Sequence, residues 1–245
     1  MARIDHVTVR SSDLDASLKL FTQVFELLEF TGRRRDGAGF YEWNDFSVAQ
    51  ADGEHPATKN VHVGFAAASR DQVDNWWKSL TSAGYADDGA PGPRREYSAS
   101  YYGAFIRDHD DNSIEAVHHD DSRAGGAIDH LWIRVHDLDP TRRFYTGIAP
   151  VLGLPFHERA DRLHFSSDAG GFTLLEGRPT ENVHLAIGVD GEEPVREFHT
   201  AGLEAGGADN GAPGERREYH VGYYGAYVRD PDGNSIEAVF HDRSR

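Results

Sequence analysis

Residues 217–239, with the sequence REYHVGYYGAYVRDPDGNSIEAV, decide the fold because they repeat residues 95–117, REYSASYYGAFIRDHDDNSIEAV, at an offset of 122 (217 − 95). The segments NVHVGF and NVHLAI, which begin at residues 60 and 182, share this offset. The openings RIDHVTVRSSDLD and AIDHLWIRVHDLD are offset by 124 (127 − 3). A nearly constant offset along the whole chain indicates a tandem duplication.

The duplication predicts two domains, the first at residues 1–121 and the second at residues 127–245. Residues 122–126 between them are small and polar, which is typical of a linker. Because the chain has 245 residues, each half is long enough to bury a core of its own.

Each half divides again into two modules with the pattern β-α-β-β-β. In the first module a strand begins near His6, Ser12 is expected to cap a helix, and apolar residues then recur at helical spacing. Three short strands follow, and the pattern starts again at residues 60, 127 and 182. The sequence therefore predicts an α+β fold built from four βαβββ modules.

The composition limits both the location and the partners of the protein. The net charge is −16, from 25 basic and 41 acidic residues, and so acidic a surface repels the phosphates of nucleic acids. No apolar run approaches the ~20 residues that cross a bilayer, and the N-terminus lacks the pattern of a signal peptide. The absence of cysteine excludes disulfides and thiolate metal sites. We expect a cytoplasmic monomer or homodimer that binds neither nucleic acid nor a membrane.

Histidine and glutamate residues recur on the strand faces that the apolar residues leave free. In NVHVGF, for example, Val61 and Val63 share one face of the strand and His62 lies on the other. Six residues share this placement, three in each half: His6, His62 and Glu115 in the first, and His130, His184 and Glu237 in the second. Two imidazoles and one carboxylate with open positions form the facial triad that binds Fe²⁺ and related metals. An isolated strand histidine is commonly a core residue, but two sets at matched spacing favour metal binding.

The four modules in tandem pairs, with a histidine near the start of each first strand and NSIEAV at the end of each pair, resemble the vicinal oxygen chelate superfamily. This superfamily includes glyoxalase I, the extradiol ring-cleaving dioxygenases and the bleomycin and fosfomycin resistance proteins. The resemblance covers essentially the whole chain. It implies that each pair of modules curls an incomplete barrel around a metal or ligand cavity, and that the same six residues are the metal ligands. The fold alone does not determine a reaction.

The resemblance also implies that Glu176, at the end of the strand GFTLLEG, is a candidate for a fourth metal ligand or a general base. Glyoxalase I-like members have a further carboxylate ligand at this position, although a glutamate at the end of a strand can equally be solvated. We expect Fe²⁺ as the cofactor, with Mn²⁺, Ni²⁺, Co²⁺ and Zn²⁺ as the alternatives.

The second copy of the repeated segment differs from the first in its polar residues. If the hairpin DPDGN is centred on Asp232, Tyr227 lies across from Glu237 on the cavity side. The run from His220 through Tyr227 to Glu237 resembles the signature of the extradiol dioxygenases, which implies acid–base chemistry for His220 and a hydrogen bond to substrate for Tyr227. Ser98 and a phenylalanine occupy these places in the first half, so we expect the second half to be catalytic. The alternative is that His220 and Tyr227 are only residues at the rim.

Three functions follow from these observations. The leading hypothesis is a metal-dependent dioxygenase of the extradiol type that acts on a small catechol-like aromatic, with Trp132, Tyr223, Tyr224 and Phe172 as candidate pocket residues. The second is a glyoxalase- or epimerase-like lyase or isomerase without O2 chemistry, in which Glu176 is a ligand or base. The third is a metal-free drug-binding protein of the bleomycin-resistance type, which would not need the inward-facing His-His-Glu sets.

Overall fold

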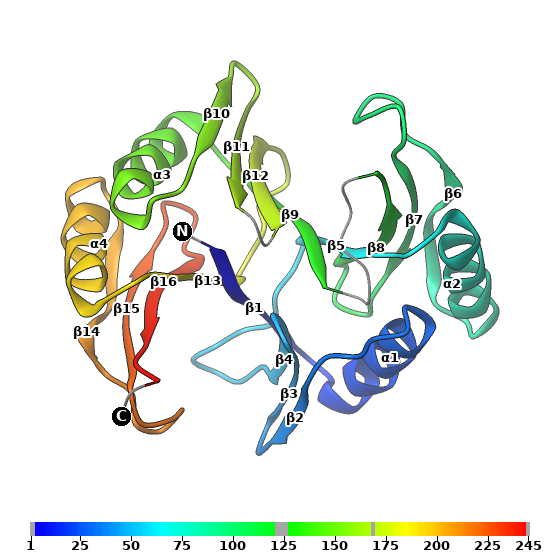
Figure 1. Ribbon diagram of the computed structural model, residues 1–245, viewed down its shortest axis with the longest axis horizontal. Helices are drawn as coiled ribbons and strands as arrows, with labels where there is room; N and C mark the ends of the chain where they lie inside the picture. Colours follow the sequence, from blue (N-terminus) through cyan, green and yellow to red (C-terminus); the bar gives the residue numbers. More distant parts are fainter. Residues whose placement is uncertain (1–2, 121–126, 168–169, 244–245) are drawn as a thin grey trace. The chain divides into compact units, whose positions relative to one another are not determined.

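The computed structural model describes residues 3–120, 127–167 and 170–243, so the expected linker at residues 122–126 lies outside the described part of the chain. The helices and strands repeat one βαβββ module four times, which confirms the predicted fold class (Figure 1). The first module comprises β1 (Arg3–Ser11), α1 (Leu14–Leu27), β2 (Arg34–Gly37), β3 (Phe40–Trp43) and β4 (Phe46–Gln50). The second comprises β5 (His62–Ala66), α2 (Arg70–Ser82), β6 (Ala86–Pro93), β7 (Tyr102–Arg107) and β8 (Ser113–His118).

The second repeat has the same order of elements. Its first module comprises β9 (Ile128–Val135), α3 (Leu138–Leu152), β10 (Phe156–Arg159), β11 (Arg162–Ser167) and β12 (Gly170–Glu176). Its second module comprises β13 (His184–Gly188), α4 (Glu192–Glu204), β14 (Ala208–Glu215), β15 (Tyr223–Arg229) and β16 (Ser235–His241).

The chain forms two compact units that differ from the two sequence repeats in one respect. Unit 1 comprises Met1–Thr8 and Ile133–Arg245, and unit 2 comprises Val9–Trp132. The first part of β1 therefore lies with the second repeat, and the first part of β9 lies with the first repeat. We call this arrangement the first-strand exchange.

In unit 1 the hydrogen-bonded strand orders are β14-β15-β16-β13-β1 and β10-β11-β12-β9. The strand β13 runs antiparallel to β1 and parallel to β16, and Ala186 pairs with His6 on one side and with Glu237 on the other. In unit 2 the orders are β1-β4-β3-β2 and β9-β5-β8-β7-β6, and Gly64 of β5 pairs with His130 and Glu115 in the same way. Each unit thus has a row of three residues with a small one at its centre.

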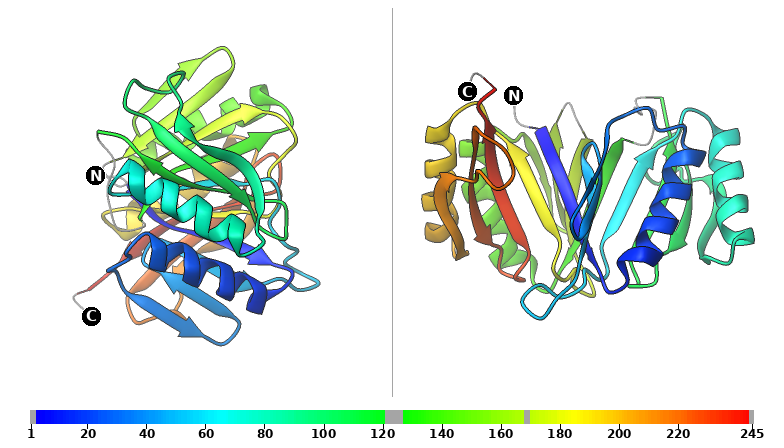
Figure 2. Two further views of the ribbon diagram at one scale, coloured as in Figure 1. Left: turned by 90° about the vertical axis from the view of Figure 1, so that its right-hand side faces the viewer. Right: turned by 90° about the horizontal axis from the view of Figure 1, so that it is seen from below.

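In each unit two helices pack beside each other against the strands. The helices α1 and α2 are neighbours in unit 2 (Figure 2), and α3 and α4 are neighbours in unit 1 (Figure 1). Helix α1 is capped by Asp13, whose Oδ1 accepts the backbone N–H of Ala16 at 3.0 Å, and not by Ser12 as the sequence suggested. The backbone N–H of Ser12 instead donates to Asp110 of the β7–β8 turn at 2.9 Å, which fixes the chain one residue before the cap.

The β15–β16 hairpin has the predicted register, because Tyr227 pairs directly with Glu237. Its turn contains Gly233 with φ 88°, a left-handed conformation that costs glycine little. The matching residue of the first repeat, Asp111, adopts φ 70°. The exchange of Asp111 for Gly233 therefore relieves backbone strain at the turn that precedes Glu237.

Candidate metal centres

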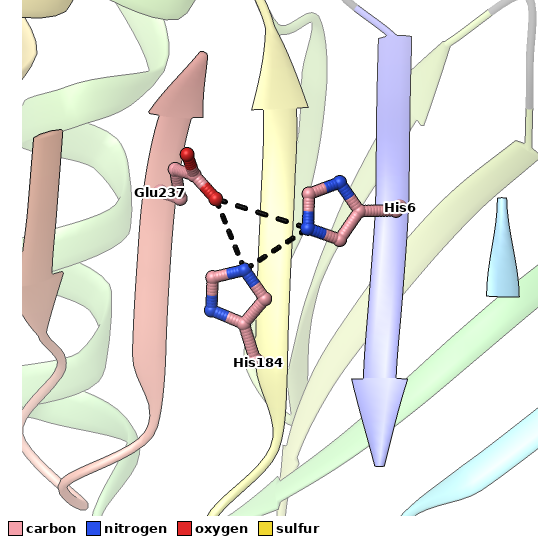
Figure 3. A group of neighbouring side chains, drawn as sticks. All are labelled: His6, His184 and Glu237. Atoms are coloured by element: carbon pink, nitrogen blue, oxygen red, sulfur yellow. Dashed lines mark hydrogen bonds and ion pairs between the residues drawn. The ribbon is translucent and has the colours of Figure 1, made fainter. Parts of the chain in front are cut away.

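Three side chains from three strands of unit 1 converge on one point, which we call site A. Figure 3 shows His6 of β1, His184 of β13 and Glu237 of β16 pointing toward one another. His184 Nε2 lies 3.2 Å from His6 Nε2 and 3.0 Å from Glu237 Oε2, and His6 Nε2 lies 3.8 Å from the same carboxylate oxygen. Site A is therefore a compact set of two imidazole nitrogens and one carboxylate oxygen.

The corresponding residues of unit 2 form a second cluster, site B. His62 Nε2 lies 3.1 Å from His130 Nε2 and 3.0 Å from Glu115 Oε2. His130 Nε2 lies 3.2 Å from the same oxygen of Glu115. These residues come from β5, β9 and β8. All six residues selected from the sequence thus belong to two equivalent sets.

The membership of the two sets differs from the sequence prediction. We expected His130 to join His184 and Glu237, but His6 occupies that place, and His130 joins His62 and Glu115. The physical reason is the first-strand exchange, which pairs β1 with β13 and β9 with β5. The grouping of the ligands by sequence repeat was therefore wrong.

The hydrogen bonds around the sites fix which nitrogen of two histidines faces the cluster. His6 Nδ1 lies 2.9 Å from Asp5 Oδ1, and His130 Nδ1 lies 2.9 Å from Asp129 Oδ1. Because an ionised carboxylate only accepts hydrogen bonds, each Nδ1 carries the hydrogen, and the lone pair of a neutral ring is on Nε2. That lone pair points at the carboxylate of Glu237 or Glu115. The lone pairs on the histidine Nε2 atoms and on the glutamate Oε2 atom repel one another at these distances unless a cation lies between them.

A divalent metal ion fits both sets. Ligand atoms about 2.1 Å from a metal ion are separated from one another by about 3 Å, which is close to the spacing in both sites. The His-His-Glu composition is that of a facial triad with open positions. The second nitrogen of each imidazole is held as well, since His184 Nδ1 lies 3.1 Å from Ser235 Oγ and His62 Nδ1 lies 3.1 Å from Ser113 Oγ. Such outer contacts orient ligands in metal sites.

Each glutamate is deeply buried and has one oxygen held by a tyrosine. The side chain of Glu237 is 1% exposed, and its Oε1 accepts a hydrogen bond from Tyr223 at 2.7 Å. Glu115 Oε1 accepts the equivalent bond from Tyr101 at 2.9 Å. Burial raises the pKa of both phenols, and the adjacent carboxylate raises the pKa further, so the phenols stay protonated donors. Oε2 of each glutamate remains directed at the two histidines.

The charges of site B show how strongly it favours a cation. Burial alone would raise the pKa of Glu115, but the hydrogen-bonded imidazoles of His130 and His62 outweigh it and hold this pKa below its usual value. Burial alone would lower the pKa of His130, but Asp129 and Glu115 raise it to about 9. A proton and a metal ion therefore compete for the same position between these groups.

Site A is the more accessible of the two. The side chains of His6 and His184 are 24% and 21% exposed, whereas those of His62 and His130 are 9% and 14% exposed. In unit 2 the indole of Trp132 packs edge-on to His62, with ring centroids 5.8 Å apart. The equivalent residue of unit 1 is a threonine, at position 8 (132 − 124). A small molecule can therefore approach site A more easily.

Tyr227 lies beside site A with an unused hydroxyl group. Its ring centroid is 6.0 Å from that of His184, and its Oη is buried and has no hydrogen-bond partner among the described residues. Burial, together with the charge of Glu237, raises the pKa of Tyr227, so the phenol keeps its proton. In site B the equivalent ring is Phe105, 5.7 Å from the ring of His62.

His220 is connected to site A through two residues that the sequence analysis did not select. Its Nδ1 lies 2.8 Å from the carbonyl oxygen of Val221, and its Nε2 lies 2.9 Å from His241 Nδ1. His241 Nε2 lies 3.1 Å from Asp5 Oδ2, and the other oxygen of Asp5 holds His6. The repeat carried a signal for these residues, because an aspartate precedes both first-strand histidines and a histidine follows both NSIEAV segments within two residues.

Other expected site residues lie elsewhere. Glu176 is exposed, and its Oε1 accepts the backbone N–H of Leu138, the first residue of α3, at 3.3 Å. A carboxylate is favoured at a helix N-terminus, and the structure brings Glu176 to neither site. The suggested aromatic pocket is not formed either, because Phe172 stacks on Phe165 in the core and Tyr224 packs against Arg196. Of these aromatic residues, Tyr223 contacts site A and Trp132 contacts site B.

Comparison with known proteins gives the family. The model of the Glyoxalase/Bleomycin resistance protein/Dioxygenase superfamily matches residues 3–116 and 127–238, and the chain belongs to this superfamily. The structure is similar to that of glyoxalase I from Zea mays, with 20% sequence identity, coverage of 98% of this chain and 93% of that chain, and a TM-score of 0.67. A glyoxalase/bleomycin resistance protein from Albidiferax ferrireducens is 30% identical over 46% of this chain and 96% of that chain, with a TM-score of 0.41.

A third solved structure is the Mn(II)-bound glyoxalase from Novosphingobium aromaticivorans, with 17% identity, coverage of 98% of this chain and 83% of that chain, and a TM-score of 0.43. No curated protein matches the sequence significantly. None of the described helices is both long enough and apolar enough to span a membrane. The likeness to the maize enzyme establishes the fold and does not determine the reaction.

Proposed function

We propose that the protein is a metal-dependent dioxygenase of the extradiol type that acts on a small catechol-like aromatic at site A. The observation that carries this proposal is an accessible set of two histidines and one glutamate beside a buried phenol that has no hydrogen-bond partner in the described part of the chain. The set suits a divalent metal with open positions, and the phenol suits a substrate oxygen held next to that metal.

His6, His184 and Glu237 would hold the metal through Nε2, Nε2 and Oε2. A divalent ion bound there supplies positive charge and open positions for two neighbouring oxygens of a diol. Tyr223 keeps Glu237 in place by donating to its other oxygen. This bond leaves Oε2 directed at the metal position.

Tyr227 would orient the substrate by donating its hydroxyl hydrogen to a substrate oxygen. A buried polar group without a partner costs about 1–3 kcal/mol, so a substrate that accepts this bond recovers an interaction that the free protein lacks. The raised pKa of Tyr227 keeps the hydrogen on the phenol at neutral pH. The phenol is thereby a donor and not a base.

His220 would exchange protons with the substrate and the solvent. It is exposed, and an imidazole can both accept and donate a proton. Its connection through His241 and Asp5 to His6 supports a role at site A. Site B has Ser98 and Phe105 in the corresponding positions, which can supply neither an imidazole nor a phenol. We therefore assign the chemistry to site A.

The test is anaerobic purification, metal analysis and an assay of a panel of catechols for yellow ring-opened products with an O2 electrode. The expected result is ring opening with O2 uptake that disappears when a chelator removes the metal. If turnover requires the metal but consumes no O2, the protein is an isomerase or lyase. If the protein binds catechols equally well with and without metal and converts none, the proposal is wrong.

A further inference from the structure

Four residues of unit 1 form one chain of hydrogen bonds that leads from the surface to a ligand of site A. The chain runs from His220 to His241, then to Asp5, and ends at His6, with separations of 2.9, 3.1 and 2.9 Å. The rings of His220 and His241 are stacked, with centroids 5.1 Å apart. Tyr223 packs edge-on against both rings, at 5.4 and 5.1 Å.

The partners of this chain determine how many protons it needs. The carbonyl oxygen of Val221 only accepts, so His220 Nδ1 must carry a hydrogen, and Asp5 Oδ2 only accepts, so His241 Nε2 must carry one as well. The contact between the two rings needs a third hydrogen, on one side or the other. Two neutral imidazoles supply only two hydrogens. The three contacts are complete only if the pair holds one additional proton.

We propose that His220 and His241 share this additional proton. The resulting positive charge weakens metal binding at site A, because it makes Asp5 a weaker hydrogen-bond acceptor for His6. The inference rests on the proposed metal site. A carboxylate that accepts from a ligating histidine makes that histidine a stronger ligand. When the cationic imidazole of His241 holds Oδ2 of Asp5, Oδ1 is a weaker hydrogen-bond acceptor for His6. His6 is then a weaker metal ligand. The positive charge also repels the metal ion directly.

The groups around the pair allow this charge and its exchange with solvent. Asp5 faces it from β1, and Tyr223 faces it from β15 with a phenol that donates to Glu237. Arg3 is a cation close to Asp5, since a Cβ built on Gly188 would lie 3.3 Å from Arg3 Nε and 3.5 Å from Asp5 Oδ2. His220 is exposed, so the pair is in contact with the solvent.

Site B provides a comparison within the same molecule. His119 Nε2 lies 2.9 Å from Asp129 Oδ2, and the other oxygen of Asp129 holds His130. This contact needs a hydrogen on one nitrogen of His119, which a neutral ring supplies. Ser98 occupies the place of His220, and a serine does not supply the second imidazole of such a pair. The two sites have the same ligands but differ in the charge behind one of them.

The test measures Co²⁺ binding, by its visible absorption, in variants that keep only one site. His62→Ala leaves site A, and His184→Ala leaves site B. In the site A background, His220→Ser is expected to raise the Co²⁺ affinity near pH 6 on the order of tenfold, in the range known for outer contacts of metal ligands. In the parent, binding of Co²⁺ favours release of the proton shared by His220 and His241, and the His220→Ser variant lacks this proton. The slope of log affinity against pH is therefore expected to be smaller in the variant, by up to one proton.

The control is His199→Ser, which removes a partly buried imidazole from another His–Asp pair in unit 1 and should change neither quantity. A purely structural role for His220 predicts lower affinity with an unchanged pH slope, and this result would overturn the proposal. Unchanged affinity and slope in His220→Ser would overturn it as well. If the His62→Ala parent itself binds no Co²⁺, the metal site of the proposed function is at fault instead.

Discussion

Replacing Tyr227 by phenylalanine is expected to stabilise the protein and to slow the proposed reaction at the same time. The change copies Phe105 of the other repeat, so the site already tolerates this ring in an equivalent position. The hydroxyl removed is buried and has no partner among the described residues. In the free protein it is a cost, whereas in the proposed complex it is the donor to a substrate oxygen.

The magnitudes follow from these two roles. An unsatisfied buried polar group costs about 1–3 kcal/mol, so the free energy of unfolding of Tyr227→Phe should rise by up to that amount. For a chain of this size each kcal/mol raises Tm by about 2–4 °C. Loss of one donor to a reacting oxygen typically lowers kcat by about 10²–10³. Metal content should be unchanged, because Tyr227 is not a ligand.

The assay combines thermal unfolding, metal analysis and the formation of ring-opened product. Tyr224→Phe is the matched control, because Tyr224 packs against Arg196, with its ring 5.2 Å from the guanidinium carbon, and lies on the face of β15 opposite Tyr223 and Tyr227. It should leave turnover at the level of the unmodified protein. A Tyr227→Phe variant that is less stable and turns over at the normal rate would refute the reasoning, because its hydroxyl would then be a structural contact.

Three further predictions follow from particular contacts. Gly64→Ala should lower metal affinity at site B at least tenfold in a titration with site A removed, because the added Cβ would overlap the imidazole of His130 and that ring would have to move. An unchanged affinity would show that the ring moves without cost. Asp230→Asn tests a carboxyl whose pKa burial raises to about 6. Because the pKa of Asp230 is higher in the folded than in the unfolded protein, the free energy of unfolding of the unmodified protein should fall relative to that of the variant as the pH rises from about 4 to about 6. Denaturant titrations should show a fall of about 3 kcal/mol. A difference in free energy that does not change with pH would contradict this. Glu115→Gln should leave turnover within a few-fold of normal, and its complete loss would move the chemistry to site B.

The repeat made much of the fold predictable from the sequence. A constant offset defined the modules, and strand alternation identified all six residues of sites A and B, because a candidate ligand must lie on the face opposite the apolar residues. The register of Tyr227 with Glu237 was predictable because a two-strand hairpin with a tight turn has few alternatives.

The grouping of the ligands was not predictable in the same way. Alternation tells which face a residue occupies, but it carries no information about which strand becomes the neighbour of β1 or β9. That choice depends on long-range packing, and here it pairs His6 with the second repeat. The sequence left the role of Glu176 open for a related reason, since its position at the end of β12 does not tell whether it faces a cavity or the N-terminus of helix α3, where it accepts the backbone N–H of Leu138.

The measurement that tests the central claim most directly is metal stoichiometry in pairs of ligand variants. If His6 and His184 belong to one site, His6→Ala with His184→Ala should lose only the metal that either single variant loses. His6→Ala with His62→Ala should lose the metal of both sites. The opposite pattern, with both metals lost from the first pair and only one from the second, would show that the ligands group by sequence repeat and that the first-strand exchange is wrong.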